Sequence, residues 1–277
     1  MKRQRLRKSL ALVSFLLFPV TIYYLSPVLP LQGASEGVLA GSLMLFGLLF
    51  LVSLVAGRAF CGWVCPSAGL HDATVLGQCR PAPRGHWVKY LIWFPWLALL
   101  AGLARRSGGF LRIDPFYQTV GGISIAEPKR YLIYYFFLTL IVVLALATGR
   151  RSFCHHICWI APFMILGRRI RNLGGWTALQ LTADKGRCNS CGRCSRECPM
   201  SLDVMGMVRG AALEQAECVL CGQCADGCPK QAIRLVWGAS GRAAGQLPYT
   251  PGNHASHDGA ESATPAVNRI EAGAEAL

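Results

Sequence analysis

The sequence predicts an α-helical membrane protein with four transmembrane helices in a two-helix repeat, followed by a small α+β bacterial-type ferredoxin domain for two [4Fe–4S] clusters. Three observations predict this. Only 15% of the 277 residues are charged and 53% are hydrophobic, whereas soluble domains carry about 25% charged residues. Four stretches are long and almost uncharged, and two copies of one cysteine motif follow them. We therefore expect a transmembrane domain over 1–172, a ferredoxin domain over 173–237 and a disordered tail over 238–277.

The four apolar stretches each reach the length of about 17 residues that a helix needs to cross the hydrocarbon core. They are Leu10–Leu31, Val38–Ala56, Trp87–Ala104 and Tyr131–Thr148. Pro19 and Pro95 lie inside two of them, where proline kinks a membrane helix without ending it. The first stretch is too long for the apolar region of a secretory signal and no A-x-A site follows it, so we expect a retained helix.

Basic residues predict the orientation. The formal net charge is +14, and Lys and Arg accumulate in cytoplasmic loops. With the N-terminus inside, 14 Lys and Arg lie on the inner segments and five on the outer loops. This count predicts a bacterial inner-membrane protein with both termini and the ferredoxin domain in the cytoplasm. The charge is then a topology signal, and no nucleic-acid partner is expected.

The most specific motif is C-x2-C-x2-C-x3-C-P, found in "CNSCGRCSRECP" (Cys188–Pro199) and in "CVLCGQCADGCP" (Cys218–Pro229). In two-cluster ferredoxins the fourth cysteine of each motif ligates the other cluster. The first cluster is expected on Cys188, Cys191, Cys194 and Cys228, and the second on Cys218, Cys221, Cys224 and Cys198. Gly192 and Gly222 permit the tight turn between ligands. Zinc knuckles use pairs of cysteines rather than triplets, and disulfides need an oxidising compartment.

Positive charge lies in or beside both motifs, at Arg187, Arg193, Arg196 and Lys230. Two interpretations are open. The charges could stabilise the reduced clusters and raise their reduction potential, or they could be ordinary solvated side chains.

A second cysteine pattern repeats in the apolar part. "GRAFCGWVCPSAG" (Gly57–Gly69) and "GRRSFCHHICWIAPF" (Gly149–Phe163) both place Phe-Cys-x3-Cys after Gly-Arg at the end of an apolar stretch. If each helix runs on through its pair, cysteines four apart share one face. The four sulfurs of Cys61, Cys65, Cys154 and Cys158 would then form a third metal, iron–sulfur or thiol centre; buried inert cysteines are the alternative. His155 and His156 are either ligands or interfacial polar residues.

This layout resembles the NapH, NosR and CcoG-like membrane ferredoxin-type proteins, and is closest to NapH, the membrane component of a quinol dehydrogenase. The resemblance covers roughly residues 1–237 and is carried by the tandem ferredoxin motif and by "CGWVCP". The second pair departs from the family's C-x3-C-P, because Trp159 follows Cys158. The resemblance implies electron transfer between the quinone pool, the clusters and a periplasmic or membrane redox partner such as a cytochrome or reductase.

We therefore predict an inner-membrane iron–sulfur protein that passes electrons between quinol and a redox partner through two [4Fe–4S] clusters. The sequence has no G-x-G-x-x-G fingerprint and no hydrolytic constellation, so no catalytic residue is assigned and an electron carrier is expected rather than an independent catalyst. The rival functions are a copper-handling assembly factor that uses the membrane cysteines, and a redox sensor.

Overall fold

The computed structural model describes residues 2–74, 85–210 and 213–239. These residues all belong to one compact unit, which extends over Met1–Gln246. The lone Cys79 and the expected tail beyond residue 239 lie outside the described residues.

The first expected span, Leu10–Leu31, is not one helix. It is divided among α1 (Lys2–Leu16), α2 (Phe18–Thr21) and α3 (Val28–Ser35). Pro19 lies in the first turn of α2, and Pro27 is the residue that precedes α3. Proline fits the start of a helix and disfavours its interior, so each proline begins a new helix instead of kinking a continuous one.

The second expected span is also shorter than predicted. β1 (Val38–Ala40) takes its first residues and pairs in parallel with β2 (Arg112–Asp114), so that α4 (Gly41–Ala56) has only 16 residues. Two helices are long and apolar enough to cross a membrane: α7 (Val88–Arg106), and α8 (Tyr131–Thr148) with the short helix η2 (Pro128–Arg130) that precedes it. Among the described residues this is weak evidence for a membrane, and four crossing helices are not found.

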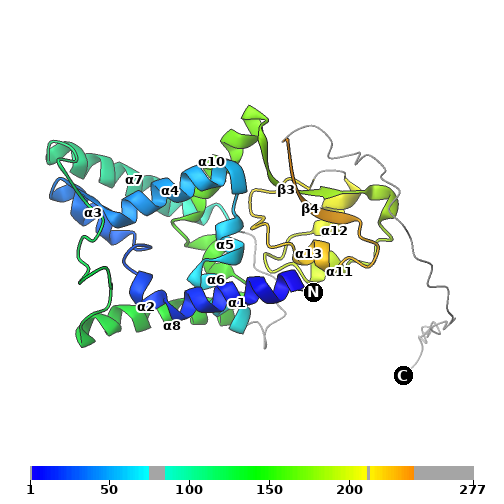
Figure 1. The fold of residues 1–277 in the computed structure, drawn as a ribbon, viewed down its shortest axis with the longest axis horizontal. Helices are drawn as coiled ribbons and strands as arrows, with labels where there is room; N and C mark the ends of the chain where they lie inside the picture. Colours follow the sequence, from blue (N-terminus) through cyan, green and yellow to red (C-terminus); the bar gives the residue numbers. More distant parts are fainter. Residues whose placement is uncertain (1, 75–84, 211–212, 240–277) are drawn as a thin grey trace, which may run out of the picture. The chain divides into compact units, whose positions relative to one another are not determined.

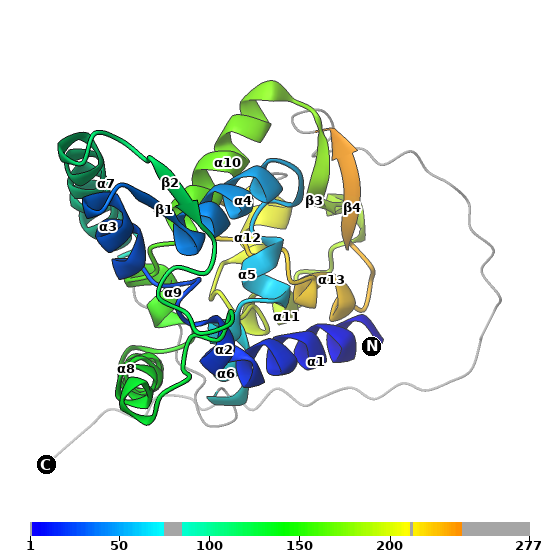
Figure 2. The ribbon, with the colours of Figure 1, turned by 60° about the vertical axis from the view of Figure 1, so that its left-hand side comes forward.

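The two halves of the helical part repeat the same order of elements. In each half a long helix leads to a five-residue helix and then to a helix that begins at or next to a proline. The first half is α4, α5 (Ala59–Trp63) and α6 (Pro66–Thr74); the second is α8, α9 (Ser152–His156) and α10 (Ala161–Gly174). The halves interlock, because α10 packs on α4 and α6 packs on α8, while α1 lies along α6 (Figure 2).

The C-terminal part is a small α+β unit. β3 (Thr177–Ala183) and β4 (Ile233–Ala239) pair antiparallel, with Thr177 opposite Ala239. Between the strands lie η3 (Lys185–Arg187), α11 (Arg193–Arg196), α12 (Val204–Arg209) and α13 (Gln223–Asp226). The helices α11, α12 and α13 gather beside this sheet (Figure 1). The boundaries at 172 and 237 stay predictions.

The largest hydrophobic core joins the two parts. It contains Phe46 of α4 and Met164 of α10, together with cysteines of both motif types, among them Cys61, Cys154 and Cys221. Burial of these side chains removes apolar surface from water on both sides at once. The two kinds of cysteine motif are therefore packed into one interior.

Candidate functional site

The two ferredoxin motifs have the same backbone conformation. Gly192 and Gly222 have φ values of 71° and 73°, which confirms the predicted tight turn at both glycines. Ser190 and Leu220, two residues before them, also have positive φ, at 58° and 49°. Residues other than glycine seldom adopt this conformation. The two motifs thus form loops of equivalent backbone conformation.

Each predicted ligand set surrounds its own cavity. One cavity is lined by Cys188, Cys191, Cys194 and Cys228, and the other by Cys198, Cys218, Cys221 and Cys224. Among the described residues, no three His, Cys, Asp or Glu side chains are grouped to hold a single metal ion. Thiolates spread around a cavity suit the larger iron–sulfur cube better than one tetrahedral ion. The residues present therefore fit the clusters that the spacing predicts, although the ligand assignment itself stays a prediction.

Burial makes some thiols of these loops weaker acids, among them those of Cys198 and Cys224. Burial raises the pKa of Cys198 to about 11, and burial followed by the charges of Cys218 and Cys221 raises the pKa of Cys224. Metal ligation requires the thiolate, and a bound metal stabilises that form. A cationic group bound in each cavity would supply the positive charge that stabilises the thiolates.

The four remaining motif cysteines do not lie on helices that run through each pair, contrary to the prediction. Helix α4 ends at Gly57 (φ 56°) and α8 ends at Gly149 (φ 103°). Cys61 and Cys154 lie in the short helices α5 and α9, and Cys65 and Cys158 follow those helices. The break occurs because glycine readily takes the positive φ that turns the chain out of a helix.

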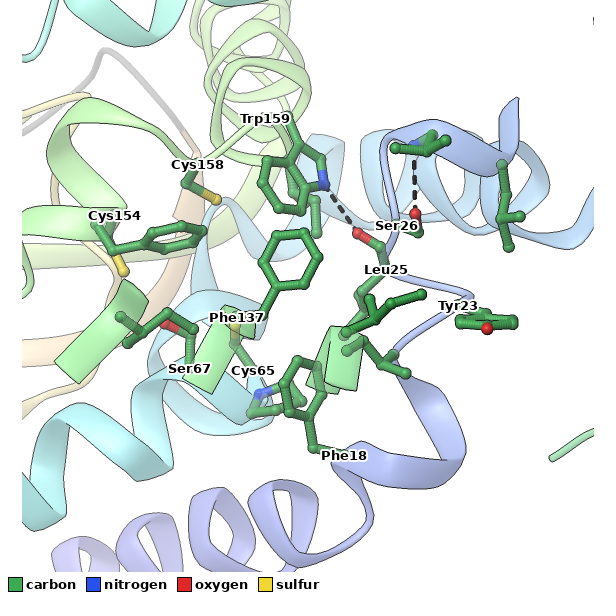
Figure 3. A pocket seen from close by; sticks show the side chains of 18 of the residues that line it. Phe18, Tyr23, Leu25, Ser26, Cys65, Ser67, Phe137, Cys154, Cys158 and Trp159 are labelled. Carbon is green, nitrogen blue, oxygen red and sulfur yellow. Dashed lines mark hydrogen bonds between the residues drawn. The ribbon is translucent and has the colours of Figure 1, made fainter. Parts of the chain in front are cut away.

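All four cysteines nevertheless line one cavity of about 430 Å³. Figure 3 shows Cys65, Cys154 and Cys158 on one side of it, with Phe18, Tyr23 and Leu25 farther along the wall. Burial, and then the charges of the other three cysteines, raise the pKa of Cys65. Burial raises the pKa of Cys158 to about 12. The cysteines that the structure describes form no disulfide.

Two fully buried arginines flank this cysteine set. Arg58 and Arg151 each stand three residues before the first cysteine of a pair and are 0% and 1% exposed. Among the described residues, Nε and Nη2 of Arg58 and Nε of Arg151 have no hydrogen-bond partner. A buried cation with unused donors is costly unless a negative group lies nearby. The arrangement suits an anionic centre at the four sulfurs.

Ion pairs fix these arginines. Arg58 donates from Nη1 to Glu217 Oε2 at 2.9 Å, and Lys89 Nζ lies 2.5 Å from Glu217 Oε1. Arg151 Nη2 lies 3.1 Å from Asp72 Oδ1, and Arg7 Nη1 lies 2.8 Å from Asp72 Oδ2.

The sequence interpretation counted all four cations as loop charges on the inner side, so it missed this network. The arginine three residues before the first cysteine of each pair was the signal that could have found two of the four, Arg58 and Arg151.

The ferredoxin loop of Cys218–Cys224 lies directly on the helical part. Trp63 Nε1 donates to Leu220 O at 3.1 Å, and Gln4 Nε2 donates to Cys221 O at 3.0 Å. A Cβ on Gly62 would lie 2.4 Å from Val219 O, so only glycine allows this approach. The second cluster site is therefore adjacent to the four-cysteine set.

The two histidines of the second repeat bind backbone carbonyls. His155 Nε2 lies 3.2 Å from Met200 O, and His156 Nδ1 lies 2.9 Å from Ser152 O. Burial lowers the pKa of His155 to about 4. These contacts give both side chains a structural role, and the ligand role that the sequence left open for them stays untested.

Comparisons with known proteins follow the same division of the chain. A family model described as a 4Fe-4S dicluster domain matches residues 187–233. A second model, described as a 4Fe-4S binding domain, matches residues 38–75 and 130–173, which contain the two Cys-x3-Cys repeats. No solved structure is similar enough to match.

Three curated relatives illustrate the range of similarity. The methylamine utilization ferredoxin-type protein MauN of Paracoccus denitrificans is 25% identical over 66% of this chain and 64% of the relative. MauN of Methylorubrum extorquens is 27% identical over 62% and 59%, and YccM of Escherichia coli is 24% identical over 66% and 52%. The chain thus spans between about half and two thirds of the length of these relatives.

The two family models and the relatives agree with the two sets of cysteine motifs. The ferredoxin-type homologues indicate an iron–sulfur electron-transfer protein. The chain carries ferredoxin-type 4Fe–4S domains and is homologous to MauN and YccM.

Proposed function

We propose that this protein is a membrane-bound electron carrier that links the quinol pool to a redox partner through two [4Fe–4S] clusters. The observation that carries the proposal is that each predicted set of four cysteines surrounds its own cavity. When bound there, iron–sulfur clusters accept and release single electrons. The cysteines hold them, and the protein around them sets their exposure and their surrounding charge.

We further propose a third redox centre at Cys61, Cys65, Cys154 and Cys158. Support comes from Arg58 and Arg151: each keeps an unused buried donor and shares its carboxylate with a second cation, so a negative charge at the sulfurs would stabilise both. The two repeats that hold these cysteines also match a model described as a 4Fe-4S binding domain. The arginines would hold the thiolates in their charged form and fix the two repeats against each other.

The cavity beside these cysteines supports a quinol site. Its volume of about 430 Å³ lies within the range of about 300–1,000 Å³ for small-molecule sites. Its wall is mostly apolar, with Phe137, Phe153 and Trp159 beside the cysteines. Trp159 is held by a hydrogen bond from Nε1 to Leu25 O at 2.8 Å. A quinol ring between these aromatic side chains would lie against the sulfurs.

A first experiment tests the clusters and the third centre. Anaerobically purified protein should contain iron and labile sulfide, and the reduced protein should give EPR signals of two [4Fe–4S] clusters. Changing Cys61 and Cys154 to serine should remove only the iron and signal beyond those two clusters. Zinc in place of iron would overturn the proposal, and an unchanged iron content would overturn the third centre.

A second experiment tests the quinol site. Ile133 lines the cavity, whereas its neighbour Leu132 is 77% exposed and does not. We expect Ile133→Trp to slow cluster reduction by a short-chain quinol at least tenfold, with normal reduction by dithionite. Leu132→Trp is the matched control and should be unaffected. Equal rates in both variants would place quinol oxidation elsewhere.

A further inference from the structure

The two cluster sites differ sharply in exposure. In the second site Cys221 and Cys224 are each 7% exposed, and Leu220 beside them is fully buried. In the first site Cys191 is exposed, as are Asn189 and Ser190 in the same loop. Only the first site therefore brings a ligand to the surface of the described part of the chain.

The helical part covers the second site and leaves the first open. Arg168 Nη1 donates to Cys218 O at 2.8 Å, beside the contacts of Trp63 and Gln4 with the same loop. On the side of the first site, Arg150 Nη1 of the helical part donates to Arg196 O at 2.9 Å, just after the loop Cys188–Cys194.

The surface around the first site is strongly basic. Residues 184–203 and 228–234 carry six Lys and Arg but only three Asp and Glu. The six cations are all exposed: Lys185, Arg187, Arg193, Arg196, Lys230 and Arg234. Two of the three acids are already engaged, since Asp184 pairs with Arg187 at 3.3 Å and Glu197 pairs with Arg193 at 2.6 Å. An excess of positive charge thus surrounds the one cluster site that is open to a partner.

We propose that this basic face, defined by those six cations around Cys191, is the docking surface for a small acidic one-electron carrier protein. The inference rests on the proposed function and adds to it the partner class and the cluster through which electrons enter or leave. Complementary charge accelerates encounter by about 10- to 1,000-fold at low salt and orients the partner. The buried second site would then exchange electrons only with the first site and the four-cysteine set.

The exchange involves one electron and no change in covalent bonds. The carrier's reduced cofactor loses one electron, and the oxidised first cluster gains it. An acidic partner suits this step, because its negative surface faces the basic face while the two cofactors approach.

The test uses the cluster-loaded full chain in nanodiscs and a reduced acidic bacterial ferredoxin as the probe. Stopped-flow absorbance measures the second-order rate of cluster reduction between about 10 mM and about 500 mM salt. Lys185→Glu with Lys230→Glu reverses two charges of the basic face that form no ion pair with any residue that the structure describes. Arg105→Glu with Arg106→Glu, at the exposed end of α7, changes the net charge equally and is the matched control.

We expect the wild-type rate to fall at least tenfold as salt rises, and the lysine variant to be about tenfold slower at low salt. The control variant should stay within about twofold of wild type. Oxidation of the pre-reduced clusters by basic cytochrome c, in which the cluster loses one electron and the haem gains it, should show the opposite salt dependence. A rate independent of salt, or equal slowing in both variants, would overturn the docking surface. Clusters that are absent or that dithionite cannot reduce would instead refute the proposed function.

Discussion

The two Cys-x3-Cys repeats share a motif but not its partners. Arg58 and Arg151 occupy the same position, three residues before a cysteine, and both are buried. Arg58 pairs with Glu217, the residue before the ferredoxin cysteine Cys218. Arg151 pairs instead with Asp72 of α6. The first repeat is therefore tied to the ferredoxin part, and the second is tied to the first.

The position after the first cysteine shows the same divergence. Gly62 in the first repeat allows Val219 O to approach, whereas His155 in the second repeat reaches Met200 O with its ring. Both contacts are made with the ferredoxin part. Gly62 makes its contact because it has no side chain, and His155 makes its contact with its ring. Equivalent local sequences can thus serve different interfaces when the surrounding fold differs.

The largest expected effect follows from removing Glu217, the ferredoxin-part acid that pairs with Arg58 of the first repeat. Glu217→Ala leaves Arg58 and Lys89 buried without their partner, which costs about 3–5 kcal/mol of unfolding free energy. Thermal unfolding in detergent, followed by circular dichroism, measures the loss. Glu127→Ala, where the carboxylate is 61% exposed and 3.8 Å from Arg130, should change stability by about 0.5 kcal/mol or less. Equal losses of unfolding free energy in the two variants would show that the buried ion pairs of Glu217 stabilise the protein no more than an exposed pair does.

The second repeat should respond more weakly. In Arg151→Met, Asp72 keeps Arg7 as a partner, so we expect a loss of about 1.5–3 kcal/mol, the value of a charged hydrogen bond. The variant should lose any signal of the four-cysteine centre and retain both ferredoxin signals in EPR. Loss of a ferredoxin signal would mean that Arg151 acts on the clusters rather than between the repeats.

Gly62→Ala tests the close approach between the parts. The added methyl group meets a backbone oxygen that cannot turn aside, so overpacking should cost about 1–3 kcal/mol. Gly47→Ala in α4 is the control, because a Cβ there meets nothing within 4 Å. Chemical denaturation compares the two. A neutral Gly62→Ala would show that the Cys218–Cys224 loop is not held against α5.

The smallest effect, counted per pH unit, is a pH dependence centred on His71 of α6, in the first half of the helical part. Burial, with the charge of Arg151, lowers the pKa of His71 to about 3. Between the unfolded pKa of about 6.5 and that value, the unfolded chain binds more protons, so stability falls with falling pH by on the order of 1 kcal/mol per unit.

Unfolding free energies measured from pH 7 to pH 4 check this dependence. His71→Gln should flatten the slope. Asp72→Asn should not, because the neighbouring Arg151 and Arg7 hold the pKa of that carboxyl below its usual range. If the unfolding free energy of His71→Gln still fell steeply with pH, the pH dependence would come from other groups.

Several features could be predicted from the sequence because they depend on a few neighbouring residues. The spacing of Cys188, Cys191 and Cys194 sets which sulfurs can line one cavity, and the turn at Gly192 is local. The pairing of Cys198 with the other loop was also predicted, because the motif repeats. The apolar helices near Val88 and Tyr131 follow from uninterrupted composition alone.

Other features were predicted wrongly because they depend on residues that are distant in the sequence. Leu10–Leu31 is apolar throughout, yet Pro19 and Pro27 start new helices once the flanking helices can pack. Val38–Ala40 form a strand instead of the first turn of a helix because they pair with Arg112–Asp114, which lie far along the chain. Composition cannot distinguish a long span from shorter packed pieces.

The sequence by itself determined the eight ferredoxin cysteines, the two Cys-x3-Cys pairs and their repeated Gly-Arg context. Only the tertiary structure decided that both pairs line one cavity, and that Arg58 and Arg151 are buried rather than solvated in loops. The reason is that ligand spacing acts within single turns of chain, whereas Glu217 lies 159 residues from Arg58. A buried charge is stable only where folding brings its partner.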